Sequence, residues 1–484
     1  MNMQDLEPKE IWENFSKLNA VPRASKKEER VIKFIEDFGK SLNLPTYIDK
    51  VGNVIIKKPD TIGMENRVTV ALQSHLDMVH QKNSDTNFDF ETEGIKMYID
   101  GDWIKAQGTT LGADNGIGVA TIMGLLASTN IPHPPLEALF TIDEETGMTG
   151  AINLQPGLLD AAMMLNLDTE EDNELTIGCA GGIDVTANGT YTENAPVTNA
   201  IAVEIVVKGL TGGHSGMDIH KGRGNANKLM NRLLQFVNEQ LSLEIASIEG
   251  GSLRNAIPRE SKAIVCFNAE AKNNFANSFK EITAIIKLEN SLTDNSLIIE
   301  YKEVAMPKLV MAKEQGISFM KAVSVCPNGI FRMSAAIKDL VQSSNNLARI
   351  ELGNGVYTIK CLTRSSVDTE KMEVAQAVRS SFELIGAKVE YGGSYPGWTP
   401  NPDSVIVKLM SELYEKMFNE KANVNACHAG LECGILNGPY PKIEMISFGP
   451  TIHGAHSPDE KVCISSVQKY WKYLLETLKQ IPVK

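Results

Sequence analysis

Long apolar runs, paired cysteines and an excess of basic residues are all missing from this 484-residue sequence. Its longest apolar stretches, such as 116–127, fall well short of the roughly 18–20 residues that a membrane-spanning helix needs. Its 7 cysteines form no C-x-x-C pair, and the acidic N-terminal residues show no secretory signal, which predicts reduced thiols in a cytoplasmic protein. Lysine and arginine number 47 against 60 aspartates and glutamates, so we expect no nucleic-acid partner. The short apolar stretches likewise predict no membrane partner.

Several common catalytic motifs are absent as well. The sequence contains no H-E-x-x-H, no G-x-x-x-x-G-K-[ST] and no G-x-S-x-G. The glycine-rich loop at 112–118 lacks the dinucleotide-binding spacing, and Asp114 inside it would repel a pyrophosphate. Hydrophobic residues make up 43% and charged residues 22% of the chain, which indicates a globular protein.

Short apolar runs alternate with helical stretches along the chain. The runs at 68–73, 136–142, 161–167 and 443–448 are typical of strands buried on both faces. A helix expected at 115–128 lies between the first two, so the pattern predicts an α/β fold with a central, mostly parallel sheet. Further strands are expected at 202–207, 262–268 and 296–302, a hairpin at 347–364, and helices at 226–240, 368–384, 403–418 and 465–480.

The first fifty residues predict two helices and the start of a hairpin. Ser25-Lys-Lys-Glu28 has the spacing of a capping box, in which each side chain bonds to a backbone N–H of the other residue. Apolar residues from Val31 to Phe38 follow at helical spacing. We therefore expect the second helix to begin just after Ser25.

Two stretches rich in turn-forming residues, at 182–199 and 391–402, are candidate domain boundaries. No convincing internal repeat lies between them. If the late strand at 443–448 joins the first sheet, the middle segment is an insertion. The predicted division is one α/β domain made of 1–186 and 392–484, and one inserted α+β domain at 187–391.

Chemically versatile side chains occur where the predicted strands end and in the loop before the helix expected at 115–128. In open α/β sheets, ligands bind outside the carboxyl ends of the strands. Five separate segments should therefore deliver imidazole and carboxylate groups to one edge of the sheet. The residues concerned are His75, Asp77, Asp114, Glu144, Glu145, Asp168 and His456.

Five of these side chains make a balanced ligand set for two divalent metal ions. Crowded carboxylates strongly raise one another's pKa unless a cation neutralises them. In the assignment whose charges balance, His75 and Asp168 bind one ion, His456 and Glu145 bind the other, and Asp114 bridges the two ions. Three carboxylates and one hydroxide match the charge of two Zn²⁺, and mixed histidine and carboxylate ligation is typical of catalytic zinc.

Two carboxylates remain outside this ligand set. Glu144 is adjacent to a ligand but surplus to the charge balance, so we expect it to be the general base. Asp77, two residues from His75, would orient that imidazole ring. We expect no ligand role for the histidines whose sequence spacing does not match a metal-binding motif. These are His80, His133, His220 and His453.

Taken singly, each predicted ligand also fits an ordinary structural role. His75-x-Asp77 is compatible with a solvated loop, Glu144-Glu145 with a charged turn, and Asp114 with a helix cap. Asp168 and His456 are likewise compatible with turn and loop positions. The interpretation as a metal site depends on finding all of them together at the strand ends.

These motifs resemble those of the co-catalytic zinc exopeptidases, the family that includes carboxypeptidase G, aminoacylase and the carnosinases. Longer strings narrow the resemblance to the bacterial aminoacyl-histidine dipeptidases (the peptidase D group). The strings are Leu76-Asp-Met-Val79, Thr109-Thr-Leu-Gly-Ala-Asp-Asn-Gly-Ile-Gly118, Gly178-Cys-Ala-Gly-Gly182, His428-Ala-Gly-Leu-Glu-Cys-Gly434 and His456-Ser-Pro-Asp-Glu460. The likeness spans nearly the whole chain and is weakest at about 270–330.

The resemblance implies a catalytic domain that holds two Zn²⁺ per chain, which Mn²⁺ or Co²⁺ can replace, and an inserted lid domain that also forms a homodimer. It implies that His214 helps to stabilise the tetrahedral oxyanion, in some relatives from the opposite subunit. It also implies that Asn255, Arg364 and Gly430 bind substrate. A guanidinium fork such as that of Arg364 suits the free carboxylate of a small peptide.

The function implied is hydrolysis of unblocked dipeptides, notably Xaa-His peptides such as carnosine, by metal-activated water with Glu144 as the base. One alternative is a related amidohydrolase, either a deacylase or a tripeptidase, that uses the same metal centre. Another is an inactive relative that only binds metal or peptide. An intact Glu144 and a complete ligand set favour the enzyme.

Overall fold

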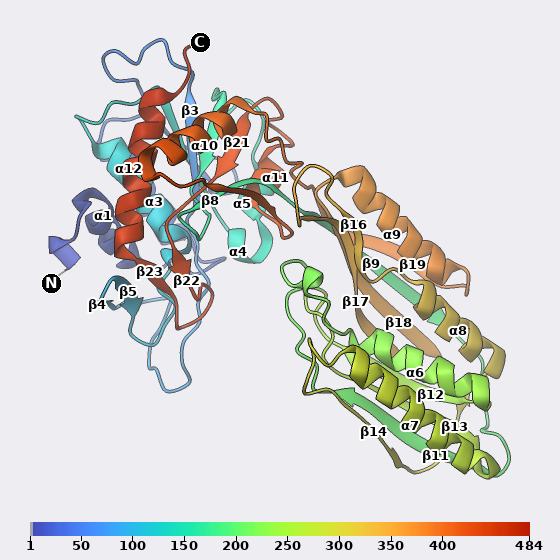
Figure 1. Ribbon diagram of the computed structural model, residues 1–484. Coiled ribbons are helices and arrows are strands. Elements are labelled where there is room, and N and C mark those ends of the chain that lie inside the picture. Colours follow the sequence, from blue (N-terminus) through green and yellow to red (C-terminus); the bar gives the residue numbers. More distant parts are fainter. Residues whose placement is uncertain (1–2) are drawn as a thin grey trace. The chain divides into compact units, whose positions relative to one another are not determined.

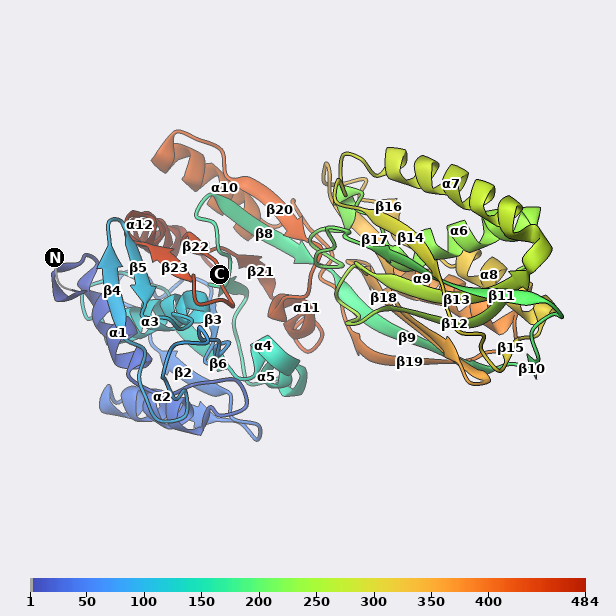
Figure 2. The same cartoon turned by 90° about the horizontal axis from the view of Figure 1, so that it is seen from below.

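The computed structural model describes residues 3–484, while Met1 and Asn2, with which the acidic N-terminal sequence begins, lie outside the described residues. The chain divides into two compact units (Figures 1 and 2). The first contains the chain up to Gly178 together with Trp398–Ala426 and Leu431–Lys484. The second contains Cys179–Gly397 and Cys427–Gly430.

Among the described residues, eight strands form the main sheet of the first unit, in the order β1-β2-β6-β3-β7-β21-β8-β20. The central strands β6, β3, β7 and β21 run parallel, and β2 and β8 join them antiparallel. Because β21 comes from the late part of the chain, the sheet combines both ends of the sequence. The strands are β1 (Thr46–Ile48), β2 (Val54–Lys58), β3 (Val70–His75), β6 (Leu136–Thr141), β7 (Met163–Asn166), β8 (Glu174–Cys179), β20 (Asn423–Cys427) and β21 (Glu444–Ser447).

The central strands of this sheet are covered on both faces. Every residue of β3 and β6 is buried, as expected for parallel strands between helical layers. Helix α3 packs against β3, α10 against β21, and α2 against β1 and β2. The helices are α1 (Lys9–Asn19), α2 (Glu29–Ser41), α3 (Ala113–Ala127), α4 (Glu144–Gly147), α5 (Thr149–Asn153), α10 (Val405–Phe418), α11 (Glu432–Leu436) and α12 (Ile464–Gln480).

A small antiparallel sheet, in the order β22-β23-β5-β4, fixes the last loop of the first unit. It pairs β23 (Lys461–Cys463) with β5 (Trp103–Ala106), and it also contains β22 (Ile452–His453) and β4 (Met97–Asp100). The loop between β22 and β23 carries His456. This pairing therefore ties a late ligand candidate to a segment that precedes α3.

The second unit is an antiparallel sheet covered by a layer of helices (Figures 1 and 2). Within the described part of the chain, its strand order is β14-β11-β13-β12-β17-β18-β9-β19, with β16 paired to β17. Helices α6, α8 and α9 contact the sheet, and α7 packs beside α6 with Phe275 against Phe267 of the sheet. The strands are β9 (Gly181–Thr190), β11 (Ala200–Lys208), β12 (Glu244–Gly251), β13 (Ser261–Asn268), β14 (Ile298–Glu303), β16 (Gly329–Met333), β17 (Val341–Gly353), β18 (Val356–Ser365) and β19 (Lys388–Tyr395), with the separate pair β10 (Glu193–Asn194) and β15 (Val310–Met311). The helices are α6 (Ala226–Gln240), α7 (Lys272–Glu289), α8 (Lys313–Val325) and α9 (Asp368–Glu383).

The α/β fold class predicted from the sequence is confirmed. Neither boundary predicted from the sequence lies in a loop. The stretch at 182–199 begins inside β9, and the boundaries drawn at 187 and 391 fall within β9 and β19. Ile183, Val185 and Ala187 are buried at alternate positions of β9. The many Thr, Asn and Gly residues of this stretch concealed that period of two.

The capping box predicted at Ser25 and Glu28 is wrong. The Ser25 hydroxyl donates to Asp77 Oδ2 at 2.8 Å instead of serving the helix. Glu28 Oε1 accepts the backbone N–H of Lys26 at 2.8 Å and that of Asp143 at 3.2 Å. Both side chains are thus engaged by the segments that carry the site candidates, a use that local spacing does not reveal.

Candidate active site

The seven site candidates of the first unit lie at or just beyond element ends. His75 is the last residue of β3, and Asp168 follows β7 by two residues. Glu144 and Glu145 open α4 shortly after β6 ends. Asp114 lies at the start of α3, and His456 in the loop before β23. The parallel order β6-β3-β7 brings three of these strand ends next to one another.

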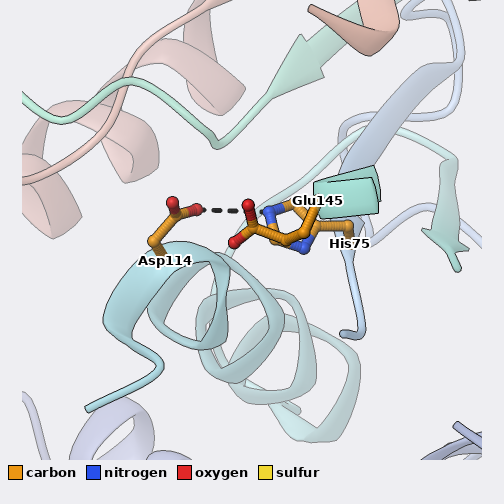
Figure 3. Close-up of side chains that lie close together, drawn as sticks. All are labelled: His75, Asp114 and Glu145. Carbon is orange, nitrogen blue, oxygen red and sulfur yellow. Dashed lines mark hydrogen bonds and ion pairs between the residues drawn. The ribbon is translucent and has the colours of Figure 1, made fainter. Parts of the chain in front are cut away.

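Asp114 is the centre of this cluster. Its Oδ1 lies 3.2 Å from His75 Nε2, and its Oδ2 lies 3.1 Å from His456 Nε2. Figure 3 shows His75, Asp114 and Glu145 converging from separate elements. One carboxylate thus faces both imidazoles, one with each oxygen.

Each imidazole also faces a second carboxylate. His75 Nε2 lies 3.4 Å from Asp168 Oδ1, and His456 Nε2 lies 3.0 Å from Glu145 Oε2. The structure therefore forms two groups that share Asp114, and their membership is that of the two-ion assignment made from the sequence. His75, Asp114, Asp168 and Glu145 are shielded from solvent, whereas the His456 side chain is 55% exposed.

The pKa values describe a site with an excess of negative charge. Hydrogen bonds to Asp114 and Glu145 raise the pKa of His456 to about 11. Burial alone would lower the pKa of His75, but Asp168, Asp114 and Asp77 outweigh it and raise that pKa well above the usual value. Burial raises the pKa of Asp168 to about 6 despite the opposing effect of His75. The cluster thus attracts positive charge strongly.

These groups fit two divalent cations. Two atoms bound to one Zn²⁺ at about 2.1 Å with a tetrahedral angle lie about 3.4 Å apart, and the four nitrogen–oxygen distances around Asp114 are 3.0–3.4 Å. Single ligand atoms of His75, Asp114 and Glu145 all lie within 4.8 Å of one another. The donor set of imidazole nitrogen and carboxylate oxygen is that of catalytic zinc sites.

Asp77 contacts both the His75 ring and the backbone of the two glutamates. The carboxylate is buried, and its Oδ1 lies 3.4 Å from His75 Nδ1. It accepts the backbone N–H of Glu144 on Oδ1 at 3.0 Å and that of Glu145 on Oδ2 at 3.3 Å. Asp77 therefore orients one imidazole and the two-glutamate turn together, as the second partner of a metal-bound histidine commonly does.

Glu144 lies beside the cluster without being part of it. Burial, together with the carboxylates of Asp168, Glu432 and Glu145, raises its pKa well above the usual value, although His75 acts in the opposite direction. A carboxyl group so placed holds a proton readily until cations lower its pKa. This is the behaviour expected of a group that accepts and returns a proton.

Asn115, to which the sequence motifs assigned no role, holds the Asp168 carboxylate in place. Its side-chain NH₂ group donates to Asp168 Oδ1 at 2.5 Å and to the Leu167 carbonyl at 2.7 Å. The signal was present in the sequence, since Asn115 directly follows Asp114 in the glycine-flanked loop. Only the fold shows that its partner is 53 positions away in the chain.

The second unit gathers its own polar group. Arg364 is buried; its Nη1 donates to Tyr395 Oη at 2.8 Å, and its Nη2 lies 3.5 Å from His214 Nε2. Asn255 is exposed beside this pair, with its carbonyl accepting the Ser215 N–H at 2.7 Å. Gly430 belongs to the same unit through the segment Cys427–Gly430. Tyr395 is a further member that the sequence did not single out, because it lies in a stretch interpreted as a boundary.

The protonation state of His214 follows from its contacts. Its Nδ1 accepts the backbone N–H groups of Gly216 and Met217 at 3.2 and 3.0 Å, and burial and the charge of Arg364 lower its pKa. The ring is therefore neutral, and its proton is on Nε2. His214 and Arg364 thus offer neighbouring N–H donors, as required by an anionic oxygen.

An α/β sheet whose strand ends gather imidazole and carboxylate groups is typical of metal-dependent hydrolases. The chain belongs to Peptidase family M20/M25/M40, which matches residues 71–480. The family membership and the enzyme class predicted from the motifs are therefore confirmed.

Two relatives align over essentially the whole chain. The cytosol non-specific dipeptidase of Escherichia coli (strain K12) is 43% identical over 482 residues, covering 100% of this chain and 99% of its own. The crystal structure of aminoacylhistidine dipeptidase from Vibrio alginolyticus is 44% identical, with a TM-score of 0.94, and the match covers 100% of this chain and 99% of that one. The aminopeptidase PepT of Bacillus cereus ATCC 10987 shares the fold at 16% identity and a TM-score of 0.57, covering 99% of this chain and 100% of that one. Across residues 3–484, none of the helices combines the length and the apolar character that crossing a bilayer requires.

Proposed function

We propose that this protein is a metallo-dipeptidase that hydrolyses unblocked dipeptides, notably Xaa-His peptides. The observation that carries the proposal is the pair of histidine and carboxylate groups that share Asp114, with Glu144 beside them. The names of the two relatives that match the full chain, a non-specific dipeptidase and an aminoacylhistidine dipeptidase, support this substrate class.

The proposed ligands are those expected from the sequence. His75 and Asp168 would hold one divalent ion, His456 and Glu145 the other, and Asp114 would bridge them. When bound, two such ions polarise a carbonyl group and make a water molecule more acidic. The native metal is proposed to be zinc, with manganese or cobalt as substitutes.

Glu144 is proposed as the general base and acid. Its carboxylate accepts the proton of the attacking water and passes that proton to the departing amine. Asp77 keeps the backbone of Glu144 and the ring of His75 in fixed orientations by the hydrogen bonds described above. The proton therefore moves through a group that is positioned before substrate arrives.

The second unit is proposed to act as a lid that binds the substrate. The N–H of His214 would donate to the oxyanion that forms at the scissile carbonyl. Arg364, whose Nε has no partner among the described residues, would bind the substrate's carboxylate through its guanidinium fork. Asn255 and Gly430 would complete the substrate site.

Two further proposals concern the setting of the enzyme. We expect it in the cytosol, where the Escherichia coli relative is placed by its name. We also expect a homodimer formed through the inserted domain. A monomeric mass in sedimentation at working concentration would contradict the dimer.

The most informative experiment is hydrolysis of a small peptide panel before and after chelation. The panel contains β-Ala-His, other unblocked dipeptides, a tripeptide and an N-acetylated dipeptide. We expect chelator-sensitive cleavage of the unblocked dipeptides alone. Cleavage of only the acetylated peptide or only the tripeptide would favour the deacylase or the tripeptidase, and metal binding without any cleavage would favour an inactive relative.

A further inference from the structure

A single buried carboxylate, that of Glu460, holds the loop that carries Asp114. Its Oε2 accepts the backbone N–H groups of Leu111 and Gly112 at 2.7 and 2.9 Å. Its Oε1 accepts those of Ala113 and Asp114 at 2.7 and 3.2 Å. Four successive N–H groups thus converge on one side chain that comes from the far end of the sequence.

This loop cannot hold itself in place. The position before α3 is Gly112, which has no side chain to cap the helix and has a φ of 68° in the left-handed region. A Cβ there would lie 2.5 Å from Arg23 Nη2 and 2.8 Å from Met78 Sδ. The unpaired N–H groups at a helix start need an acceptor, and here Glu460 supplies it.

Arg23 binds the same loop through a backbone carbonyl group. Its guanidinium is buried, and its Nη2 donates to the Gly112 carbonyl at 2.5 Å. Its Nη1 donates to the carbonyls of Leu76 and Asp77 at 3.1 and 3.0 Å. Arg23 therefore joins the loop of Asp114 to the segment that directly follows His75.

We propose that Glu460 and Arg23 are positioning residues, which fix the Asp114 carboxylate between the two imidazoles before any metal binds. The proposal rests on the proposed function, because it assumes that Asp114 is a metal ligand. Together the two side chains connect three ligand-bearing segments: the end of β3, the loop before α3, and the loop that carries His456, four residues before Glu460. A shift of any of these segments would change the distances between Asp114 and the two imidazoles. Glu460 and Arg23, called the clamp below, should therefore determine the metal affinity.

The charges of the clamp suit this task. Burial raises the pKa of Glu460, and the hydrogen bonds from the backbone N–H groups of Gly112, Asp114 and Leu111 act in the opposite direction because they favour the carboxylate. Hydrogen bonds to a carboxylate are about twice as strong as neutral ones. Arg23 places a positive charge close to the acidic cluster without using an atom of any proposed ligand side chain. The loop is therefore held through its backbone, which leaves the oxygens of Asp114 available.

The test measures Zn²⁺ affinity in protein stripped of metal, by competition with a chelator of known affinity. In Glu460→Gln, the amide NH₂ group would meet two backbone N–H groups as donor against donor. We expect a 10–100-fold weaker affinity, the usual cost of losing a partner that orients a metal ligand. Asp459→Asn is the matched control, since it makes the same change at the adjacent, exposed position and should bind Zn²⁺ like the wild type.

Arg23→Lys keeps the charge but loses the fork that spans three carbonyls, and it should weaken Zn²⁺ binding in the same direction. If Glu460→Gln does not fold, the Zn²⁺ affinity of Arg23→Lys tests the proposal instead. A merely structural role would lower the melting temperature of the stripped protein and leave the Zn²⁺ affinity unchanged. Folded variants with wild-type affinity would overturn the clamp alone, whereas a wild-type protein that binds no Zn²⁺ would overturn the metal centre on which it rests.

Discussion

At the scale of single residues, Glu144 and Glu145 are neighbours with different surroundings. Glu145 Oε2 lies 3.0 Å from His456 Nε2, whereas burial, together with nearby carboxylates, raises the pKa of Glu144. Glu144→Gln should keep both metals and lower kcat by about 10²–10⁴-fold, the usual cost of losing a general base. Glu145→Gln should instead lose one metal first and regain part of its activity at high zinc.

The two variants are compared by metal content and kcat measured on the same preparations. Both replacements keep the size of the side chain and remove one negative charge, so each serves as the control for the other. Loss of metal from Glu144→Gln with full retention in Glu145→Gln would show that the roles are reversed. Near-normal turnover of Glu144→Gln would show that another group takes the proton.

Arg364 gives a second prediction at this scale. Replacement by alanine removes a charged hydrogen-bond donor from the proposed carboxylate site, which should raise KM for dipeptides by about 10–100-fold. The control substrate is a dipeptide amide, which has no carboxylate and should be affected little by the replacement. An equal loss for both substrates would assign Arg364 to another task.

At the scale of secondary-structure elements, Glu432 fastens α11 to the sheet. Its carboxylate is fully buried, and its Oε2 accepts Gln73 Nε2 of β3 at 2.6 Å and Thr141 Oγ1 of β6 at 2.7 Å. Burial is the main cause that raises its pKa from 4.5 to about 7. The folded protein therefore binds this proton more tightly than the unfolded chain does.

This difference predicts how stability depends on pH. The contribution of Glu432 is fully present below the unfolded pKa of 4.5 and is lost as pH rises through about 7, a change of about 3 kcal/mol in the free energy of unfolding. In metal-stripped protein, Glu432→Gln should therefore gain stability relative to the wild type between about pH 5 and pH 8. Denaturant midpoints would test this, with Glu415→Gln, exposed on α10, as control; an identical pH dependence of wild type and Glu432→Gln would contradict it.

The elements with a clear period were predictable from the sequence. The helix expected at 226–240 is α6 (Ala226–Gln240), and the hairpin expected at 347–364 lies within β17 and β18. The strand ends that carry His75 and Asp168 were predictable for another reason, since these strands are short, continuous apolar runs. Helices α7 and α8, in the region where the family resemblance is weakest, were not predicted, although Phe275, Phe279, Ile282 and Ile286 recur at helical spacing in α7.

Contacts between distant parts of the chain could not be predicted. Glu460 accepts N–H groups 346–349 positions earlier in the sequence, and the Ser25 hydroxyl bonds to Asp77 rather than to its own helix. Local spacing describes periods and caps, but it does not show which remote backbone groups need an acceptor. The ligand types were therefore accessible from the sequence, whereas the residues that hold the ligands in place were not.

At the scale of the whole molecule, bound metal should contribute to stability. The chain carries a formal net charge of −13, and the first unit concentrates several carboxylates in one cluster. A cation that binds only the folded state stabilises it by about 2.7 kcal/mol at a free concentration 100 times its Kd. Chelation should therefore lower the melting temperature and zinc should restore it, as calorimetry can measure. An unchanged melting temperature would show that the acidic cluster is stable without a cation.

The central claim is that peptide hydrolysis depends on metal held by the groups around Asp114. The most direct measurement is the return of dipeptide hydrolysis as Zn²⁺ is titrated into chelator-stripped protein, with bound metal determined at each point. The account predicts that activity rises with binding and reaches its plateau at about two equivalents per chain, and that Asp114→Asn fails to recover it. Full activity in protein that contains no transition metal, or recovery by Asp114→Asn at the same stoichiometry, would contradict the account.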